Sequence, residues 1–198
     1  GITATVIATA LGTLAALGLS RPHMPFKGII MAILISPMIV PLIITAAGMF
    51  FFYARVNLVY TFTGVILAHV ALATPFVVIT VTATLVGFDM NMVKAAQSLG
   101  AKPTRTFFKV IMPLILPGII SGALFAFITS FDEVVIVMFM ASLDQLTIPK
   151  QMWAGIRQEI SPVILCMATC LVVLSIFLLT TVELLRRRSE KLRGITAR

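Results

Sequence analysis

The chain has 198 residues, of which 60% are apolar and only 11% are charged, and it carries a net charge of +8. A soluble domain is about 45–50% apolar and about 25% charged. The composition therefore excludes a disordered chain, a secreted disulfide scaffold and most soluble enzymes. It favours a polytopic membrane protein, in which excess Lys and Arg are expected on the cytoplasmic side.

Five apolar segments are near or above the ~20 residues that cross ~30 Å of hydrocarbon as a helix. They cover residues 2–19, 29–52, 58–86, 114–141 and 163–185. We expect helices because a helix satisfies its own backbone groups in lipid. The predicted fold class is all-α, a polytopic transmembrane helical bundle in which residues 1–198 form one domain. Since Gly1 already lies in an apolar stretch, we also expect residues upstream of it.

Basic residues alternate between the connections and predict the orientation. Most of them lie between segments one and two, between segments three and four, or after segment five. These are Arg21, Lys27, Lys94, Lys102, Arg105, Lys109, Arg186, Arg187, Arg188, Lys191, Arg193 and Arg198. By the positive-inside rule, residues 87–113 are cytoplasmic and residues 142–161 external. The numbered N-terminus is then outside and the C-terminus cytoplasmic.

The only cysteines, Cys166 and Cys170, are four residues apart in the fifth segment. This spacing places them on one helical face and fits neither a zinc site nor a relaxed disulfide. We predict that they pack inertly in a buried helix, and we expect no metal site in the chain.

The cytoplasmic connection has the pattern of a short helix. Asp89 is a suitable N-cap, and Gly100 is a suitable residue just past the C-terminus because glycine reaches positive φ without penalty. Ala95 and Ala96 form a flat patch between them. A second helix is expected from Pro103. The connection is either a docking element for a cytoplasmic partner or an interfacial loop on anionic lipid headgroups.

The sequence around this patch resembles the EAA loop of importer-type ABC-transporter permeases. The family pattern is Glu-Ala-Ala, three residues, Gly, nine residues, Ile, one residue, Leu-Pro. Four positions match it, namely Ala95, Ala96, Gly100 and Pro113. Val110 and Met112 replace the apolar Ile and Leu, whereas Lys94 stands where the family usually has Glu.

This resemblance implies the fold of a type I ABC importer permease, similar to MetI, with a coupling helix that docks on an ATPase. The implied docking residues are Lys94, Ala95, Ala96, Ser98, Gly100, Ala101, Arg105, Phe107 and Phe108. The chain has no G-x-x-x-x-G-K-[ST] phosphate loop. We therefore expect no enzymatic activity and no cofactor in this chain, with ATP and Mg²⁺ bound by a separate ATPase subunit.

Small residues recur every four positions in the fourth segment, at Gly118, Gly122, Ala126 and Ser130. Such a stripe lets another helix approach closely, so we predict that this face packs against protein.

Two carboxylates, Asp132 and Glu133, follow within the same apolar run. Intramembrane carboxylates are costly and usually face a cavity or a partner group. Three interpretations stay open. The pair belongs to a network between helices, attracts cations along a substrate path, or forms a proton relay that would need His69 nearby in space.

The stretch from Ser130 to Val135 and that from Leu146 to Trp153 resemble permeases of the spermidine/putrescine-type subfamily. The resemblance implies a substrate path that favours a cationic or amine-bearing solute. Its residues would be Ser130, Phe131, Asp132 and Glu133.

The external connection contains an amphipathic helix whose apolar face holds Met152, Trp153, Ile156 and Ile160. It is a membrane-surface helix anchored by Trp153, or a ledge that meets a substrate-binding protein, or both. On the second interpretation the contacts would be made by Lys150, Trp153 and Arg157.

The sequence thus predicts a permease subunit of a binding-protein-dependent ABC importer in the bacterial inner membrane. Its expected partners are a second, different permease subunit, two cytoplasmic ATPase subunits, an external solute-binding protein and membrane lipid, with no nucleic acid. An ion-coupled secondary transporter using Asp132, Glu133 and His69 is the alternative, although the paired repeats of such transporters are not visible. A membrane scaffold that only recruits a partner is a third possibility.

Overall fold

The computed structural model describes residues 1–21, 23–86, 89–158 and 162–192, and every regular element in these ranges is a helix. The elements are α1 (Ile2–Leu19), α2 (Lys27–Ile39), α3 (Leu42–Arg55), α4 (Phe62–Val86), α5 (Met90–Ser98), α6 (Pro103–Thr106), the π-helix η1 (Phe107–Ile111), α7 (Met112–Phe131), α8 (Val135–Met140), α9 (Ile148–Gln158) and α10 (Pro162–Leu192). The all-α class is confirmed.

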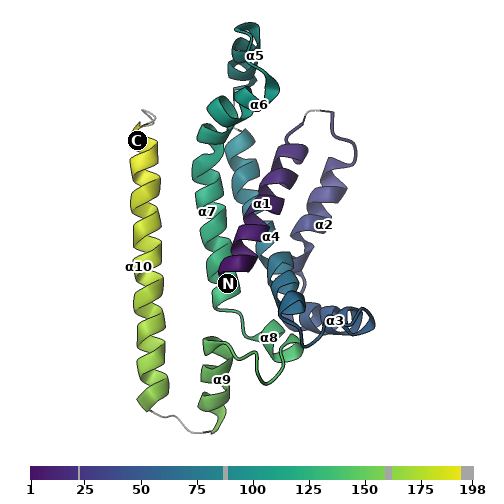
Figure 1. Cartoon of the computed structure of the whole chain (residues 1–198), viewed down its shortest axis with the longest axis vertical. Coiled ribbons are helices and arrows are strands. Elements are labelled where there is room, and N and C mark those ends of the chain that lie inside the picture. Colours follow the sequence, from purple (N-terminus) through teal and green to yellow (C-terminus); the bar gives the residue numbers. More distant parts are fainter. Residues whose placement is uncertain (22, 87–88, 159–161, 193–198) are drawn as a thin grey trace.

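The long helices run between two ends of the bundle (Figure 1). We call them the α5 end, which carries α5 and α6, and the α9 end, which carries α8 and α9. Four helical segments in the described part are long and apolar enough to cross a membrane. They are Ile2–Leu19, Phe62–Val86, Pro103–Phe131 and Pro162–Thr181. A fifth is added if α2 and α3 count as one span.

The prediction of one helix over residues 29–52 is wrong, because α2 and α3 meet at an angle of 106°. Val40 at the break is extended, with ψ of 134°, and Pro41 follows it. A proline disfavours the helical conformation in the residue before it and has no N–H for the helix. As a result α3 leaves the bundle sideways near the α9 end (Figure 1).

The predicted helix over residues 114–141 is also wrong at its C-terminal part. α7 ends at Phe131, and α8 starts a new helix at Val135. The carboxylate of Glu133 accepts hydrogen bonds from the first amides of α8, and this local pairing competes with continuation of α7. At its N-terminal end α7 is continuous with η1 and α6. The helix expected from Pro103 is therefore the start of one helical segment, Pro103–Phe131.

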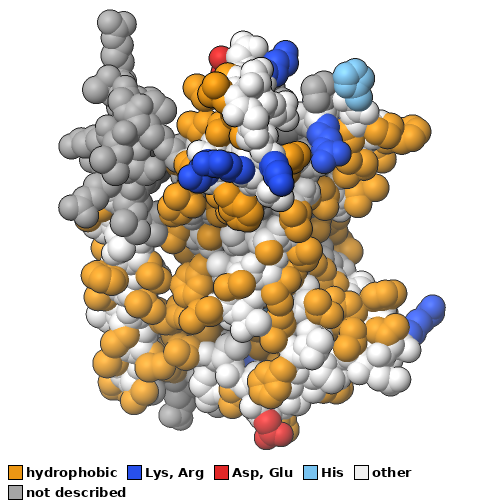
Figure 2. Space-filling model, turned by 45° about the horizontal axis from the view of Figure 1, so that its top comes forward, with side chains coloured by type: hydrophobic (Ala, Val, Ile, Leu, Met, Phe, Trp, Pro, Cys, Tyr) orange, Lys and Arg blue, Asp and Glu red, His pale blue; other side chains and the backbone are white. Residues whose placement is uncertain are grey.

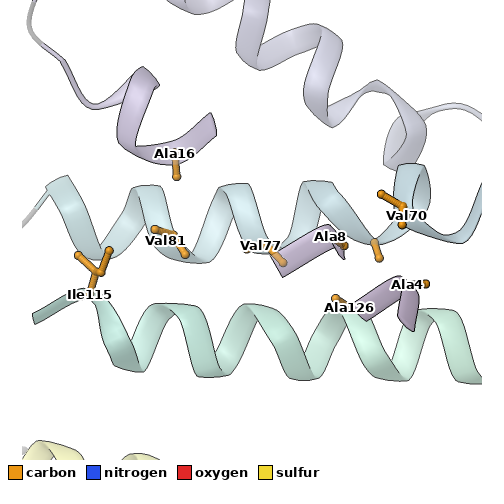
Figure 3. Packing of buried hydrophobic residues seen from close by; sticks show 9 residues of the cluster. Ala4, Ala8, Ala16, Val70, Val77, Val81, Ile115 and Ala126 are labelled. Atoms are coloured by element: carbon orange, nitrogen blue, oxygen red, sulfur yellow. The ribbon is translucent and has the colours of Figure 1, made fainter. Parts of the chain in front are cut away.

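α1, α4 and α7 pack against one another to form the core, and α1 crosses both α4 and α7 (Figure 3). The small stripe of α7 is buried against α4, as the sequence predicts. A Cβ on Gly122 would lie 2.5 Å from Thr80 Oγ1 and 2.9 Å from Val77 Cα. α1 carries a second stripe of buried small residues that the sequence analysis missed. It consists of Ala4, Ala8, Gly12 and Ala16. These stripes let three helices pack at short range.

The surface in Figure 2 is largely apolar, and Lys and Arg gather at the α5 end. α10 packs mainly against α7 and α9, and none of its apolar window is buried. The predicted burial of Cys166 and Cys170 is therefore wrong for this chain, because both side chains are exposed and free. Lipid or another subunit has to cover this helix.

Candidate substrate path and docking surfaces

The two carboxylates at the end of α7 differ in exposure. Glu133 is 6% exposed, whereas Asp132 is exposed. The chain leaves the helix between Phe131 and Val135, so neighbouring side chains diverge instead of following one helical face. The sequence analysis treated the pair as one unit; in the structure both residues line one cavity, but they differ in burial and in hydrogen-bond partners.

Glu133 belongs to a buried polar cluster that joins α4, α7 and α8. Its carboxylate oxygens accept hydrogen bonds from the backbone N–H groups of Ile136 at 2.7 Å and Val137 at 3.1 Å. His69 Nε2 lies 3.7 Å from Glu133 Oε2. His69 Nδ1 is 2.7 Å from Ser130 Oγ, within hydrogen-bond distance. These contacts are those of a network between helices, and His69 also lies close enough to Glu133 in space to meet the condition stated for a proton relay.

Replacing Glu133 by Ala is expected to destabilise the protein by about 1–3 kcal/mol, because it leaves buried N–H groups without an acceptor. Thermal unfolding of the purified protein in detergent measures the loss. Asp132→Ala is the matched control, because it removes a neighbouring carboxylate that is exposed and so should change stability little. Equal losses for the two variants would contradict the assignment.

The exposed Asp132 opens into a cavity of about 640 Å³ near the α9 end, and the buried Glu133 also borders this cavity. Both helix breaks contribute to the wall, through Val40 and Pro41 on one side and Val134 on the other. Phe76 of α4 adds an aromatic surface and stacks on Phe125, with ring centroids 6.2 Å apart. Asp132 also borders a second cavity of about 270 Å³ between α7 and α10.

This arrangement suits an amine-bearing ligand. A carboxylate attracts an ammonium group, an aromatic face adds cation–π attraction, and apolar walls accommodate an alkyl stem. Of the other residues assigned to the path, Ser130 is buried at the His69 contact. Phe131 borders the second cavity and stacks on Phe127, with centroids 5.3 Å apart.

The α2–α3 break is a part of this wall that the sequence analysis did not find. A signal was present, because Pro37 and Pro41 lie four residues apart within one apolar segment. Two prolines at this spacing weaken a helix more than one does, and broken membrane helices are tolerated where they line a cavity.

At the α5 end, the expected caps of α5 are present. The Asp89 carboxylate accepts a hydrogen bond of 2.9 Å from the N–H of Asn91. Gly100 has φ of +78°, which explains why glycine stands there. Ala95 is exposed and Ala96 half-buried, so the alanine patch is accessible in part.

The other residues assigned to docking are spread over α5, α6 and η1. Lys94, Ser98 and Arg105 are exposed, whereas Ala101 is half-buried. Phe108 is 65% exposed and meets Phe107 edge to face, with centroids 5.1 Å apart. The alanine patch and the two phenylalanines thus come from separate helical segments, and α5 projects beyond the bundle (Figure 1).

α9 holds the residues assigned to binding-protein contact. Lys150 Nζ is 3.5 Å from the carbonyl oxygen of Val137, so this side chain turns toward α8. Arg157 lies over the ring of Trp153 at 5.4 Å from its centroid, and Trp153 is 46% exposed. The fourth member of the predicted apolar face, Ile160, lies outside the described residues.

Comparison with known proteins shows to which class of protein the chain belongs. Residues 8–191 match the family described as binding-protein-dependent transport system inner membrane component, and the chain belongs to this family. It is thus a permease subunit of a binding-protein-dependent ABC importer, a non-catalytic, multi-pass inner-membrane protein that works with ATPase subunits and a binding protein. It carries no cofactor, and ATP is bound by the partner ATPase. This membership excludes the ion-coupled secondary transporter and the scaffold.

Individual relatives are consistent with the class. The chain is 31% identical over 187 residues to the spermidine/putrescine transport system permease protein PotC of Haemophilus influenzae, covering 94% of this chain and 73% of that protein. It is 37% identical over 103 residues to the putrescine transport system permease protein PotI of Escherichia coli, covering 52% of this chain and 37% of that protein.

A solved structure supports the fold. One chain of the MetNI methionine ABC transporter in an inward-facing conformation superimposes with a TM-score of 0.67. The match covers 96% of this chain and 94% of that chain at 18% identity. The predicted MetI-like fold is confirmed.

Proposed function

We propose that this permease passes a small amine-bearing or cationic solute of the polyamine type, and that Asp132 is the charge that attracts it. The observation that carries the proposal is the opening of the exposed Asp132 into the 640 Å³ cavity between the two helix breaks. Its volume lies within the range of about 300–1,000 Å³ that is usual for small-molecule sites. The transport systems named for PotC and PotI support the choice of solute.

The cavity offers one exposed carboxylate, Asp132, because Glu133 in the same wall is buried and already accepts two backbone hydrogen bonds. An exposed carboxylate with apolar neighbours fits one end of a flexible polyamine. The alkyl segment would lie along Leu72 and Phe76, which line the same cavity. The remaining ammonium groups need acceptors from elsewhere, and a second, different permease subunit is the proposed source. Such a subunit would also cover the apolar surface of α10, which this chain leaves exposed.

The proposed orientation places the α5 end in the cytoplasm, with the numbered N-terminus outside and the C-terminus inside. The gathering of Lys and Arg at the α5 end supports it (Figure 2). α5 and η1 would dock on one ATPase subunit through the residues named above, in a complex that holds two such subunits. At the α9 end, Trp153 and Arg157 would meet the binding protein, and Lys150 would hold α9 against α8.

Asp132→Asn tests the proposal in the complete transporter, reconstituted with its ATPase and binding protein in vesicles. We expect the KM for spermidine uptake to rise by about tenfold, which corresponds to the loss of one charge-assisted contact of roughly 1.5 kcal/mol. Asp144→Asn is the control, because Asp144 is an exposed carboxylate beyond the cavity. An unchanged KM would overturn the role of Asp132. ATPase stimulation by a binding protein loaded with a solute without amino groups, and not by one loaded with spermidine, would overturn the solute class.

A further inference from the structure

His69 lies within α4, where an apolar side chain would be easier to bury. It is 5% exposed, and its Nε2 has no hydrogen-bond partner in the described part of the chain. A buried polar group without a partner costs free energy, whereas an apolar residue of similar volume costs none. Packing alone therefore does not account for a histidine at this position.

His69 lies close to residues on both sides of Asp132 in the chain, namely Ser130 and Glu133. On one side, His69 Nδ1 holds Ser130, two residues before it, at 2.7 Å. On the other side, Glu133 is held by the first amides of α8 and lies 3.7 Å from His69 Nε2. The polar contacts on both sides of the break that presents Asp132 to the cavity thus meet at one side chain of α4.

The cluster is also close to a second arrangement, because His69 Nε2 and Glu133 Oε2 are 3.7 Å apart. A hydrogen bond needs a separation of about 2.7–3.2 Å, so a shift of under about 1 Å would bring His69 Nε2 and Glu133 Oε2 within reach of each other. That shift would satisfy the unpartnered nitrogen and would move the break relative to α4. The exposed Asp132 is the residue that such a movement displaces.

We propose that His69 is a positioning residue of the translocation path, which sets the place of Asp132 in the cavity through Ser130 and Glu133. Its consequence for transport rests on the proposed function of Asp132, but the positioning itself does not. The test therefore reads the position of residue 132 directly, without the use of a transported solute.

The test measures how fast a cationic methanethiosulfonate reagent modifies the thiol introduced by Asp132→Cys. It uses the assembled transporter in membranes, with the change read on this chain by mass spectrometry. The native thiols are first removed by Cys166→Ser and Cys170→Ser, because both are exposed. Into this background we introduce His69→Ala, which removes both ring nitrogens, and His69→Asn, whose amide can keep the bond to Ser130.

We expect His69→Ala to change the modification rate by about fivefold or more in either direction, as the loss of one buried hydrogen bond would. His69→Asn should fall between the background and His69→Ala. The control is Val70→Ala, which removes volume from the next buried position of α4 and should stay within about twofold. A rate for His69→Ala that stays within the range of the control overturns the proposal.

Two further readouts keep the outcomes separate. If His69→Ala does not assemble, as judged by gel filtration of the complex, His69→Leu takes its place, because it keeps most of the volume and removes both ring nitrogens, and a rate within the range of the control overturns the proposal. If Asp132→Asn leaves uptake unchanged but His69→Ala alters the modification rate, the proposed role of Asp132 fails and the positioning role of His69 stands.

Discussion

Replacement of Gly122 by Val is expected to abolish accumulation of the folded permease. A Cβ at this position would lie 2.9 Å from Val77 Cα, which is backbone and cannot move aside as a side-chain end does. Overpacking of this kind typically lowers the free energy of unfolding by about 1–3 kcal/mol. We expect Gly122→Val to lie at the upper end of that range, because the added atom would meet backbone. The measurement is the amount of monodisperse protein recovered from membranes.

The matched control is the same substitution at Gly48 in the middle of α3, where an added Cβ meets nothing within 4 Å. Gly48→Val should accumulate at the level of the unaltered chain, since valine costs no more than glycine inside a helix. Normal recovery of Gly122→Val would contradict the close approach of α4 and α7.

Replacement of Gly100 by Val is expected to uncouple transport from ATP hydrolysis while the protein still inserts. Gly100 has φ of +78°, and a side chain in the left-handed region costs roughly 1–2 kcal/mol, more for a β-branched residue. An added Cβ has open space around it, so the strain is local to the end of α5. Because about 1.4 kcal/mol corresponds to a tenfold change in rate, we expect this strain to lower uptake by about tenfold or more. ATPase activity should no longer respond to the loaded binding protein.

Gly100→Asn separates backbone strain from the loss of glycine itself, because asparagine enters the left-handed region more readily than other side chains. Its uptake should lie between those of the unaltered chain and Gly100→Val. If Val and Asn reduced uptake equally, the effect would come from the side chain's contacts and not from the conformation of the turn.

Much of the fold could be predicted from the sequence because it depends on composition and on local chemistry. The apolar segment over residues 2–19 coincides with α1, and the caps of α5 at Asp89 and Gly100 are those expected. The four-residue spacing of the stripe through Gly122 was sufficient to predict its packing face. Each of these features depends on residues within a few positions of one another.

The helix breaks were harder to predict because apolar content does not distinguish a straight helix from a bent one. The residues around Pro41 and Glu133 keep the hydropathy of a span, so the two segments read as continuous. Backbone geometry before a proline explains the first break, and a carboxylate bound to the next helix explains the second. The burial of α10 was overestimated because the surface of one chain depends on subunits and lipid outside it.

Local sequence thus determined the helices, their caps and their small-residue faces, since these follow from backbone propensity and side-chain spacing. Tertiary structure alone decided that Glu133 is buried beside His69, 64 positions away in the chain, while Asp132 stays exposed, although both residues line the same cavity. Neighbouring carboxylates have the same chemistry in a sequence. Their burial and hydrogen-bond partners come to differ only when the ends of separate helices pack together, because both are properties of that packing.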